Sequence, residues 1–198
     1  MERRLIGLDL DDVLMDFNAG LCDFHNTRYG TSLTKKDIIS YNLEKTWNCE
    51  KEEAIRRVKE FYLSPEHDAT QPVEGAIGVV KELRGNWDIA IITSRPKSVS
   101  RQTYTWLEKN FPFLSESVHF ALHPFHNETT VTKRDICQRL GVEVFVDDAL
   151  FHIEDVASVV GQAFLFDAPW NQNSELILPN IRRINSWNEI RSLLTKEK

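Results

Sequence analysis

The stretch RLIGLDLDDVL, residues 4–14, determines the predicted fold. Its first part, residues 4–9, is a short apolar run that ends in Asp9, which predicts a buried β-strand with a carboxylate at its end. Asp11 and Asp12 follow directly after that end. An aspartate after a strand is often only a turn residue or a helix N-cap, and Asp12 fits that simpler role.

Outward from this stretch, strands and helices alternate along the chain. Apolar runs predict strands, and apolar residues at helical spacing predict the helices between them. This alternation implies a parallel sheet with helices on both faces, so we expect an α/β, Rossmann-like fold. The predicted strands are 4–9, 87–93, 118–122, 142–148 and 162–167, and the predicted helices lie around 14–24, 76–83, 99–107, 132–140 and 152–160, with a last helix from Ser186.

The segment 31–72 carries more charge and fewer β-branched residues than its surroundings. Thr34 followed by Asp37 predicts a helix start, and a later apolar helical stripe is expected to end at Pro65. We therefore predict a small helical cap inserted after the first strand. The predicted division is residues 1–16 and 73–198 for the α/β core and residues 17–72 for the cap.

Composition and charge exclude several classes of protein. The 198 residues have a hydrophobic fraction of 41% and a formal net charge of −6. A protein that holds DNA or RNA through phosphate contacts is usually more basic, so we expect no nucleic-acid polymer as a partner. No apolar run approaches the ~18 residues of a membrane span. The cysteines number 3, an odd count without zinc-type spacing, which predicts reduced thiols in a cytoplasmic protein.

Polar side chains follow three of the predicted strands. Because ligands bind beyond the carboxyl ends of parallel strands, we expect these side chains to gather at one edge of the sheet. Carboxylates held this close repel one another, and a divalent cation relieves the repulsion; all-oxygen ligands favour Mg²⁺. The residues are Asp9, Asp11 and Asp12 after the first strand, Thr93, Ser94 and Arg95 after the second, and Asp147 and Asp148 after the strand at 142–148.

These motifs resemble those of the haloacid-dehalogenase-like (HAD) superfamily. Residues 6–14 (IGLDLDDVL) are similar to its first motif, residues 91–93 (IIT) to its second, Lys133 to its third, and residues 144–148 (VFVDD) to its fourth. Order and approximate spacing agree across the whole chain, and the first and fourth motifs are specific when they occur together. The resemblance implies a phosphatase on a Rossmann-like core.

The likeness extends to one branch of the superfamily, the 5'(3')-deoxyribonucleotidases and their bacterial relatives. Residues 9–20 resemble the start of that branch, where a phenylalanine follows the motif, and residues 166–171 and 184–187 resemble its late part. Asp12 departs from the branch, which usually has glycine there, although other HAD phosphatases carry aspartate. The resemblance implies a small phosphorylated substrate, first of all a nucleotide, and is compatible with a homodimer.

The resemblance also implies a role for each site residue. Asp9 would attack phosphorus and form an aspartyl-phosphate, while Asp11 would protonate the leaving oxygen and later activate water. Asp9, the backbone carbonyl of Asp11, Asp147 and Asp148 would bind Mg²⁺, and which of the last two binds it directly stays open. The phosphate-binding residues would be Thr93, Ser94 and Lys133.

Several side chains have a second interpretation. Lys133 fits equally a solvated lysine in the first turn of a helix. Phe17 either stacks on a substrate base, as the branch implies, or packs in the core, and Arg95 is placed to touch substrate. For the aromatic residues of the insert, packing is favoured over a role in a substrate pocket; these are Tyr41, Trp47, Phe61 and Tyr62. The loop-like region with His119, His123 and His126 lacks a fourth ligand for zinc.

Three functions remain open from the sequence. The first is a nucleotidase acting on (deoxy)nucleoside monophosphates, and the second is a HAD phosphatase of another small metabolite such as a sugar phosphate. The third is a non-catalytic phosphate-binding protein on the same fold. The intact Asp9, Asp11 and paired aspartates at 147–148 argue against the third function, because loss of the nucleophile would be its first sign.

Overall fold

The computed structural model describes residues 3–114, 117–122, 130–173 and 175–195. Within these residues, six parallel strands form one sheet in the order β3-β2-β1-β4-β5-β6. The predicted α/β fold with a parallel sheet is confirmed. The strands are β1 (Arg4–Leu8), β2 (Trp87–Thr93), β3 (Val118–Phe120), β4 (Val144–Asp147), β5 (Gln162–Phe166) and β6 (Ile181–Ile184).

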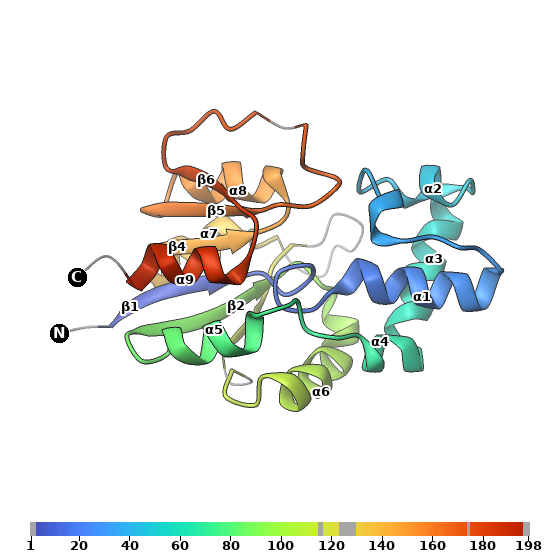
Figure 1. Cartoon of the computed structure of the whole chain (residues 1–198), viewed down its shortest axis with the longest axis horizontal. Helices are drawn as coiled ribbons and strands as arrows, with labels where there is room; N and C mark the ends of the chain where they lie inside the picture. The colour runs from blue at the N-terminus through green and yellow to red at the C-terminus, as the bar shows by residue number, and fades with distance from the viewer. Residues whose placement is uncertain (1–2, 115–116, 123–129, 174, 196–198) are drawn as a thin grey trace.

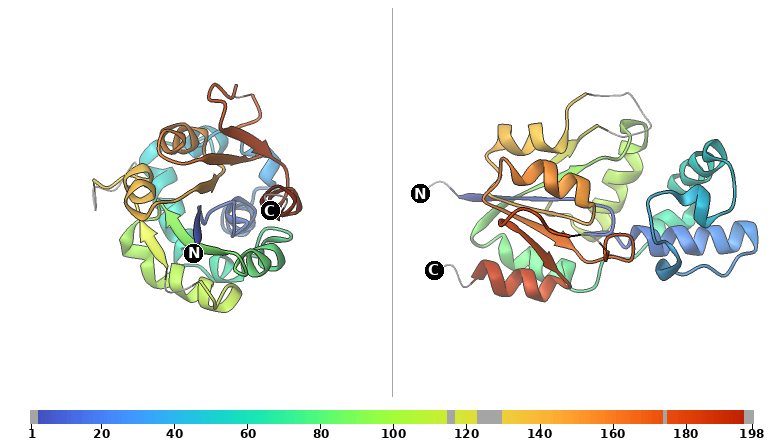
Figure 2. Two further views of the ribbon diagram at one scale, coloured as in Figure 1. Left: turned by 90° about the vertical axis from the view of Figure 1, so that its left-hand side faces the viewer. Right: turned by 90° about the horizontal axis from the view of Figure 1, so that it is seen from above.

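Helices cover both faces of the sheet, as the view along the strands in Figure 2 shows. One core cluster, which includes Trp106 and Trp187, joins the sheet to α5 (Ala76–Leu83), α6 (Ser100–Asn110) and α9 (Trp187–Thr195). A second cluster around Phe145 joins it to α7 (Lys133–Leu140) and α8 (Leu150–Ala157). Gly7 of β1 leaves room for that ring, because a Cβ at Gly7 would lie 2.9 Å from Phe145 Cδ2.

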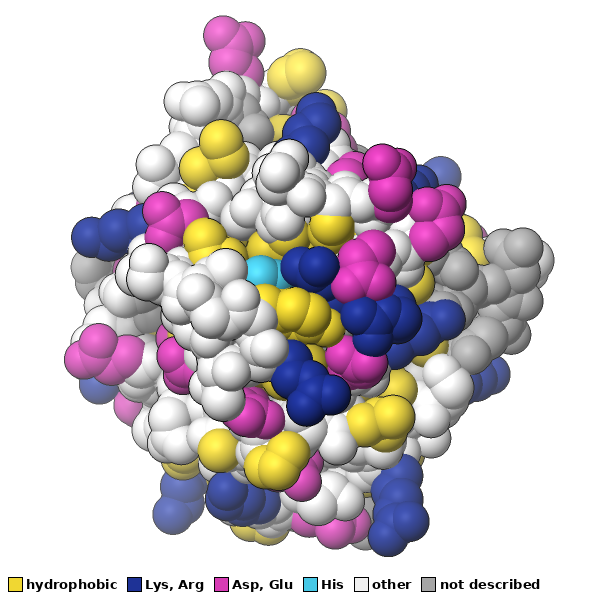
Figure 3. Space-filling model, turned by 90° about the vertical axis from the view of Figure 1, so that its right-hand side faces the viewer, with side chains coloured by type: hydrophobic (Ala, Val, Ile, Leu, Met, Phe, Trp, Pro, Cys, Tyr) yellow, Lys and Arg dark blue, Asp and Glu magenta, His cyan; other side chains and the backbone are white. Residues whose placement is uncertain are grey.

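A helical insert between β1 and β2 stands beyond the carboxyl ends of the strands (Figure 1). Its outer face mixes acidic and basic side chains, as Figure 3 shows, and within α3 Arg56 pairs with Glu53 and Glu60. These exposed ion pairs within one helix stabilise α3 only modestly. The elements of the insert are α1 (Phe17–Tyr29), a 3₁₀ turn (Lys35–Asp37), α2 (Leu43–Thr46), α3 (Lys51–Tyr62) and α4 (Pro65–Ala69).

Two chain crossings connect the insert to the sheet domain, and they lie side by side. Met15 and Pro72 form an isolated antiparallel bridge, and the backbone N–H of Asp16 donates to the Gln71 carbonyl at 2.9 Å. This adjacency supports the borders that we propose between the core, residues 1–16 and 73–198, and the cap, residues 17–72.

The edge strand β6 is not predicted by the sequence. Its four residues, IRRI, contain two arginines, and only Ile181 and Ile184 are buried. A short strand at the edge of a sheet needs one apolar face and tolerates charge on the other, so its apolar signal is weak. Pairing with β5 stabilises it as a strand.

Helix ends agree with the sequence where glycine marks them and differ elsewhere. Gly30 and Gly141 follow α1 and α7 in the left-handed conformation, which glycine adopts readily at helix ends. The prediction that Pro65 ends the preceding helix is wrong, because α3 ends at Tyr62 and Pro65 opens α4 after the N-cap Ser64. Proline suits a first helical position, where its missing N–H is not needed. Smaller differences are that Thr34 opens only the 3₁₀ turn, β3 ends at Phe120, and α8 spans Leu150–Ala157.

Candidate active site

Three buried carboxylates meet at the carboxyl edge of the sheet. Asp9 follows β1, and Asp147 and Asp148 lie at the end of the neighbouring strand β4. One carboxylate oxygen from each lies within 4.8 Å of the others, and the three residues are 6%, 0% and 5% exposed. Among the described residues, this is the cluster that could hold a metal ion. The structure thus brings the two acidic strand ends together.

Lys133 lies inside this cluster rather than in solvent. Its Nζ is 2.7 Å from Asp9 Oδ1 and 2.7 Å from Asp147 Oδ2, and the residue is 3% exposed. The side chain reaches the site because α7 begins there, with Thr132 as N-cap in a capping box. Burial alone would lower the pKa of Lys133, but Asp147 and Asp9 raise it, so the ammonium group stays charged. The alternative of a solvated lysine does not hold.

The charges of the cluster do not balance without a cation. Burial raises the pKa of Asp9 to about 8, although Lys133 opposes the shift, and burial together with Asp147 raises the pKa of Asp148 well above its usual range. One lysine against three buried carboxylates leaves excess negative charge, which a divalent cation bound to oxygen ligands would neutralise. The donor set therefore fits Mg²⁺.

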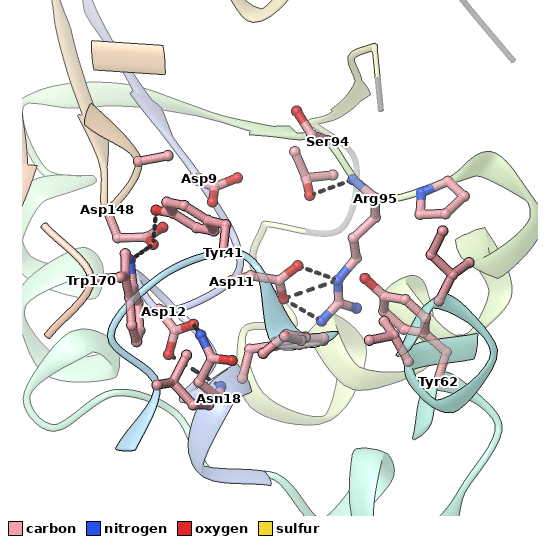
Figure 4. Close-up of a pocket in the computed structure, with 18 of the residues that line it drawn as sticks. Asp9, Asp11, Asp12, Asn18, Tyr41, Tyr62, Ser94, Arg95, Asp148 and Trp170 are labelled. Atoms are coloured by element: carbon pink, nitrogen blue, oxygen red, sulfur yellow. Dashed lines mark hydrogen bonds and ion pairs between the residues drawn. The ribbon is translucent and has the colours of Figure 1, made fainter. Parts of the chain in front are cut away.

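The oxygens of the two β4 carboxylates have different partners. Asp147 Oδ1 accepts from the Ala149 N–H at 2.9 Å, and its Oδ2 accepts from Lys133 at 2.7 Å. Asp148 Oδ2 accepts from the Tyr41 hydroxyl at 2.9 Å and from the Trp170 indole N–H at 2.7 Å (Figure 4). Both oxygens of Asp147 are thus engaged, whereas the partners of Asp148 converge on one oxygen.

Asp11 faces the opposite side of the pocket and pairs with Arg95 (Figure 4). The Arg95 Nη2 lies 2.6 Å from Asp11 Oδ1, and its Nε lies 3.0 Å from Oδ2. Arg95 is 2% exposed, and its guanidinium lies over the rings of Phe17 at 5.5 Å and Tyr62 at 5.3 Å. Arg95 is therefore held by the candidate proton carrier and by aromatic rings of the insert.

Asp12 plays the turn role that its position suggests. It has φ 56°, and its carboxylate accepts from the backbone N–H of Asn18 at 3.2 Å and from the Asn18 side chain at 2.7 Å. Lys35 of the insert lies 2.8 Å from the same carboxylate. Aspartate tolerates this left-handed conformation better than most residues.

The end of β2 supplies two hydroxyl groups to the same edge. Thr93 is 1% exposed, and its Oγ1 accepts from the backbone N–H of Arg95 at 3.2 Å. Ser94 Oγ lies 3.3 Å from His152 Nε2. Both hydroxyl-bearing residues line the same pocket as Asp9 and Lys133.

A pocket of about 720 Å³ joins the carboxylate cluster to the insert. The sheet edge contributes its charged and hydroxyl groups, and the insert contributes mostly apolar walls. Phe17 lines this pocket although it is only 8% exposed, because the rest of its ring packs against Phe61 and Tyr62. The apolar wall residues include Phe17, Ile38, Leu43, Val58, Tyr62 and Phe151.

Residues 3–198 match the model of the family described as 5' nucleotidase, deoxy (pyrimidine), cytosolic type C protein. The chain belongs to this nucleotidase family. It is 26% identical over 191 residues to a 5'(3')-deoxyribonucleotidase of Bacillus subtilis, covering 95% of this chain and 96% of that protein. The resemblance of the sequence to the deoxyribonucleotidase branch is thereby confirmed, and with it the assignment to phosphohydrolases.

Solved structures of HAD hydrolases share the fold of this nucleotidase. A HAD-like hydrolase from Streptococcus pneumoniae superposes with a TM-score of 0.67 at 15% identity, covering 97% of this chain and 98% of that one. The HAD hydrolase YfnB from Bacillus subtilis, solved with magnesium, has a TM-score of 0.65 at 16% identity, covering 98% and 99%. At these identities the likeness establishes the architecture.

Three side chains of the nucleotidase site are not assigned to it from the sequence. Tyr41 and Trp170 bind Asp148, and His152 contacts Ser94. Trp170 lies in the late stretch that resembles the deoxyribonucleotidase branch, but the resemblance assigned no role to its side chain. Tyr41 and His152 carry no local signal, because their partners lie 107 and 58 positions away.

The sequence argued against a membrane span and against a zinc site. No helix in the described part of the nucleotidase is long and apolar enough to cross a membrane. Two of the three histidines considered for a zinc site, His123 and His126, lie outside the described residues.

Proposed function

We propose that the protein is a Mg²⁺-dependent phosphomonoesterase that hydrolyses (deoxy)nucleoside monophosphates, with Asp9 as the nucleophile. The observation that carries the proposal is the buried cluster of Asp9, Asp147, Asp148 and Lys133 at the base of a pocket of about 720 Å³. The nucleotidase family gives the reaction class. The description of the Bacillus subtilis relative as a 5'(3')-deoxyribonucleotidase supports a nucleotide substrate.

Asp9 and Asp11 divide the chemistry in this proposal. A bond forms between an Asp9 carboxylate oxygen and phosphorus while the bond from phosphorus to the nucleoside oxygen breaks. Asp11 gives its proton to that leaving oxygen, and then takes a proton from the water that hydrolyses the aspartyl-phosphate. Arg95 lies where it can orient the Asp11 carboxylate whenever that group is ionised.

The remaining charges bind the metal and the phosphate. Bound Mg²⁺ would supply positive charge beside the phosphoryl oxygens. Asp9, Asp148 and the backbone carbonyl of Asp11 are the direct ligands that we propose, and Asp147 acts indirectly because both of its oxygens are already engaged. Thr93, Ser94 and Lys133 are the proposed phosphate-binding residues.

The pocket walls favour a nucleoside over a sugar as the leaving group. An aromatic base buries apolar surface against the apolar walls, whereas a sugar alone has little apolar surface to bury there. Phe17 and Tyr62 present ring surface to this space. We further propose a cytoplasmic protein, since the family is described as a cytosolic type, and the homodimer remains a prediction.

A screen of phosphomonoesters in the presence of Mg²⁺ tests this function. The set contains deoxynucleoside and nucleoside monophosphates with 5' or 3' phosphate, sugar phosphates and 4-nitrophenyl phosphate. We expect the highest kcat/KM for a nucleoside monophosphate. A higher kcat/KM for a sugar phosphate would contradict the proposed nucleotide substrate but not the proposed mechanism. A lack of hydrolysis of every ester would refute the whole proposal.

A further inference from the structure

The insert reaches the carboxylate cluster through one short segment, residues 35–41, which we call the strap. Lys35 at its start lies 2.8 Å from Asp12 and also pairs with Asp16, both in the loop after β1. Tyr41 at its end donates to Asp148, which directly follows β4. The strap therefore spans the loops that carry two of the proposed metal ligands, Asp9 and Asp148.

Tyr41 combines an exposed ring with an inward hydroxyl group. The residue is 48% exposed, yet its oxygen lies 2.9 Å from Asp148 Oδ2, which belongs to a residue only 5% exposed (Figure 4). Its ring makes edge contacts with Phe151 at 5.7 Å and a tilted contact with Trp170 at 6.1 Å. The ring stays half-exposed despite these contacts, so the inward hydroxyl is the feature that distinguishes this residue.

The core holds the rest of Asp148 in place. The Asn171 side chain donates to the Asp148 backbone carbonyl at 2.8 Å and to the Phe166 carbonyl at 2.8 Å, which fixes the turn after β4 against β5. The Trp170 indole N–H donates to Asp148 Oδ2 at 2.7 Å. One donor to this oxygen thus comes from the core and the other from the insert.

We infer that Tyr41 is a positioning residue, whose hydroxyl orients the Asp148 carboxylate for a divalent cation and links docking of the strap to metal binding. Hydrogen bonds that hold metal ligands typically account for about 10–100-fold in metal affinity. Two donors on one oxygen leave the second oxygen of Asp148 for the cation. Because linkage is reciprocal, a cation that prefers the oriented carboxylate also favours the docked strap. This inference rests on the proposed metal site.

Tyr41→Phe tests the inference, because it removes the hydroxyl and keeps the ring. The matched control is Tyr29→Phe, which removes another hydroxyl of the insert that donates to a carboxylate, Glu60, at 3.0 Å and away from the site. Calorimetric titration of Mg²⁺ into metal-stripped, substrate-free protein gives the affinity without any turnover. We expect about 10–100-fold weaker binding for Tyr41→Phe and an unchanged value for Tyr29→Phe.

Amide hydrogen exchange of residues 38–42 tests the coupling to the strap. We expect Mg²⁺ to slow this exchange in the wild type and in Trp170→Phe, which keeps the Tyr41 hydroxyl, but not in Tyr41→Phe. Affinity for Mg²⁺ in Tyr41→Phe equal to or tighter than wild type would overturn the inference while leaving the proposed function intact. A wild type that binds no Mg²⁺ would overturn the metal site itself, and the inference with it.

Discussion

At the scale of single residues, Asp9 and Asp11 lie two positions apart but have different partners. Asp9 points into the buried cluster with Lys133 and Asp147, whereas Asp11 lies at the pocket wall against Arg95. The proposed nucleophile, Asp9, thus has a cation beside it. The proposed proton carrier, Asp11, lines the same pocket beside Arg95. These environments predict different consequences of the same substitution.

Asp9→Asn is expected to abolish the aspartyl-phosphate and almost all turnover, because the amide is a poor nucleophile. Asp11→Asn should cost ~10²–10⁴-fold with a nucleotide, the usual contribution of proton transfer. It should cost much less for the phosphorylation step with 4-nitrophenyl phosphate, whose leaving group needs no proton. Rapid-quench detection of the phosphoenzyme with both esters measures this. Wild-type turnover in Asp9→Asn would contradict the covalent mechanism, and equal losses on both esters would remove Asp11 from the proton-transfer role.

Arg95→Lys separates substrate binding from orientation of Asp11. Lysine keeps the charge but loses the two-point contact with the carboxylate. If Arg95 orients Asp11, kcat for a nucleotide should fall roughly tenfold or more with little change in KM, and 4-nitrophenyl phosphate should be less affected, in keeping with the size of proton-transfer effects. Steady-state kinetics on both esters decides. A raised KM with unchanged kcat would instead support the predicted contact of Arg95 with substrate.

At the scale of elements, the insert supplies the apolar wall of the pocket and has its own small core. Phe17 and Phe24 lie on the same helix, α1, and both contact Phe61 of α3. Phe17 also lines the pocket, whereas Phe24 is not among its lining residues. The two phenylalanines therefore form a matched pair that separates packing from substrate contact.

Phe17→Ala and Phe24→Ala should each cost about 3–5 kcal/mol of stability, the usual range for a buried phenylalanine. Only Phe17→Ala should weaken nucleotide turnover more than turnover of 4-nitrophenyl phosphate, because only that ring faces the pocket. Thermal melts and kcat/KM on the two substrates measure the two effects. The same loss on both substrates for Phe17→Ala would assign this residue to packing alone.

Acid should weaken the insert through His25. Its ring accepts from Arg57 Nη1 at 2.9 Å and lies 2.8 Å from Thr31 Oγ1, and burial, aided by Arg57, lowers its pKa from 6.5 to about 4. The unfolded chain therefore binds a proton first as the pH falls. The stabilising contribution is complete above pH 6.5 and is lost as the pH falls to about 4.

His25→Gln provides the measurement, because glutamine can accept from Arg57 but does not titrate. The fall in melting temperature between pH 7 and pH 4.5 should be smaller in this variant than in the wild type. His67 of α4, whose pKa burial also lowers to about 4, keeps its share of the acid sensitivity in both proteins. An identical fall in the two proteins would show that His25 does not contribute.

At the scale of the whole molecule, the proposed metal ligands follow β1 and β4, and Tyr41 of the insert contacts one of them, so a bound cation should stabilise the entire fold. EDTA is expected to abolish hydrolysis, and added Mg²⁺ to restore it. At 100 times its Kd, Mg²⁺ should add about 2.7 kcal/mol, which corresponds to about 5–10 °C in Tm for a protein of this size. Calorimetric melts with and without Mg²⁺ check this. Full activity in metal-stripped protein would rule out the proposed mechanism.

The sequence alone determined the sheet and the acidic strand ends. Both follow from local rules: apolar runs predict buried strands, and the carboxyl ends of parallel strands share one edge, so Asp9 and Asp147–Asp148 were expected at that edge. Their direct contact also requires β1 and β4 to be neighbours, which the structure shows. The short edge strand β6 escaped prediction because its two arginines interrupt the apolar signal. The family also followed from these motifs, and the family model that matches residues 3–198 confirms it although the identity to the Bacillus subtilis relative is only 26%.

Only the tertiary structure decided which polar groups contact one another at that edge. The Arg95 pair with Asp11 joins positions 84 residues apart, and the Tyr41 bond to Asp148 joins positions 107 apart. No local periodicity specifies such contacts, because they depend on how the insert packs over the sheet and on side-chain rotamers. The start of α7 at this edge turned Lys133 inward, and packing within the insert placed Phe17 at once in its core and on the wall of the pocket.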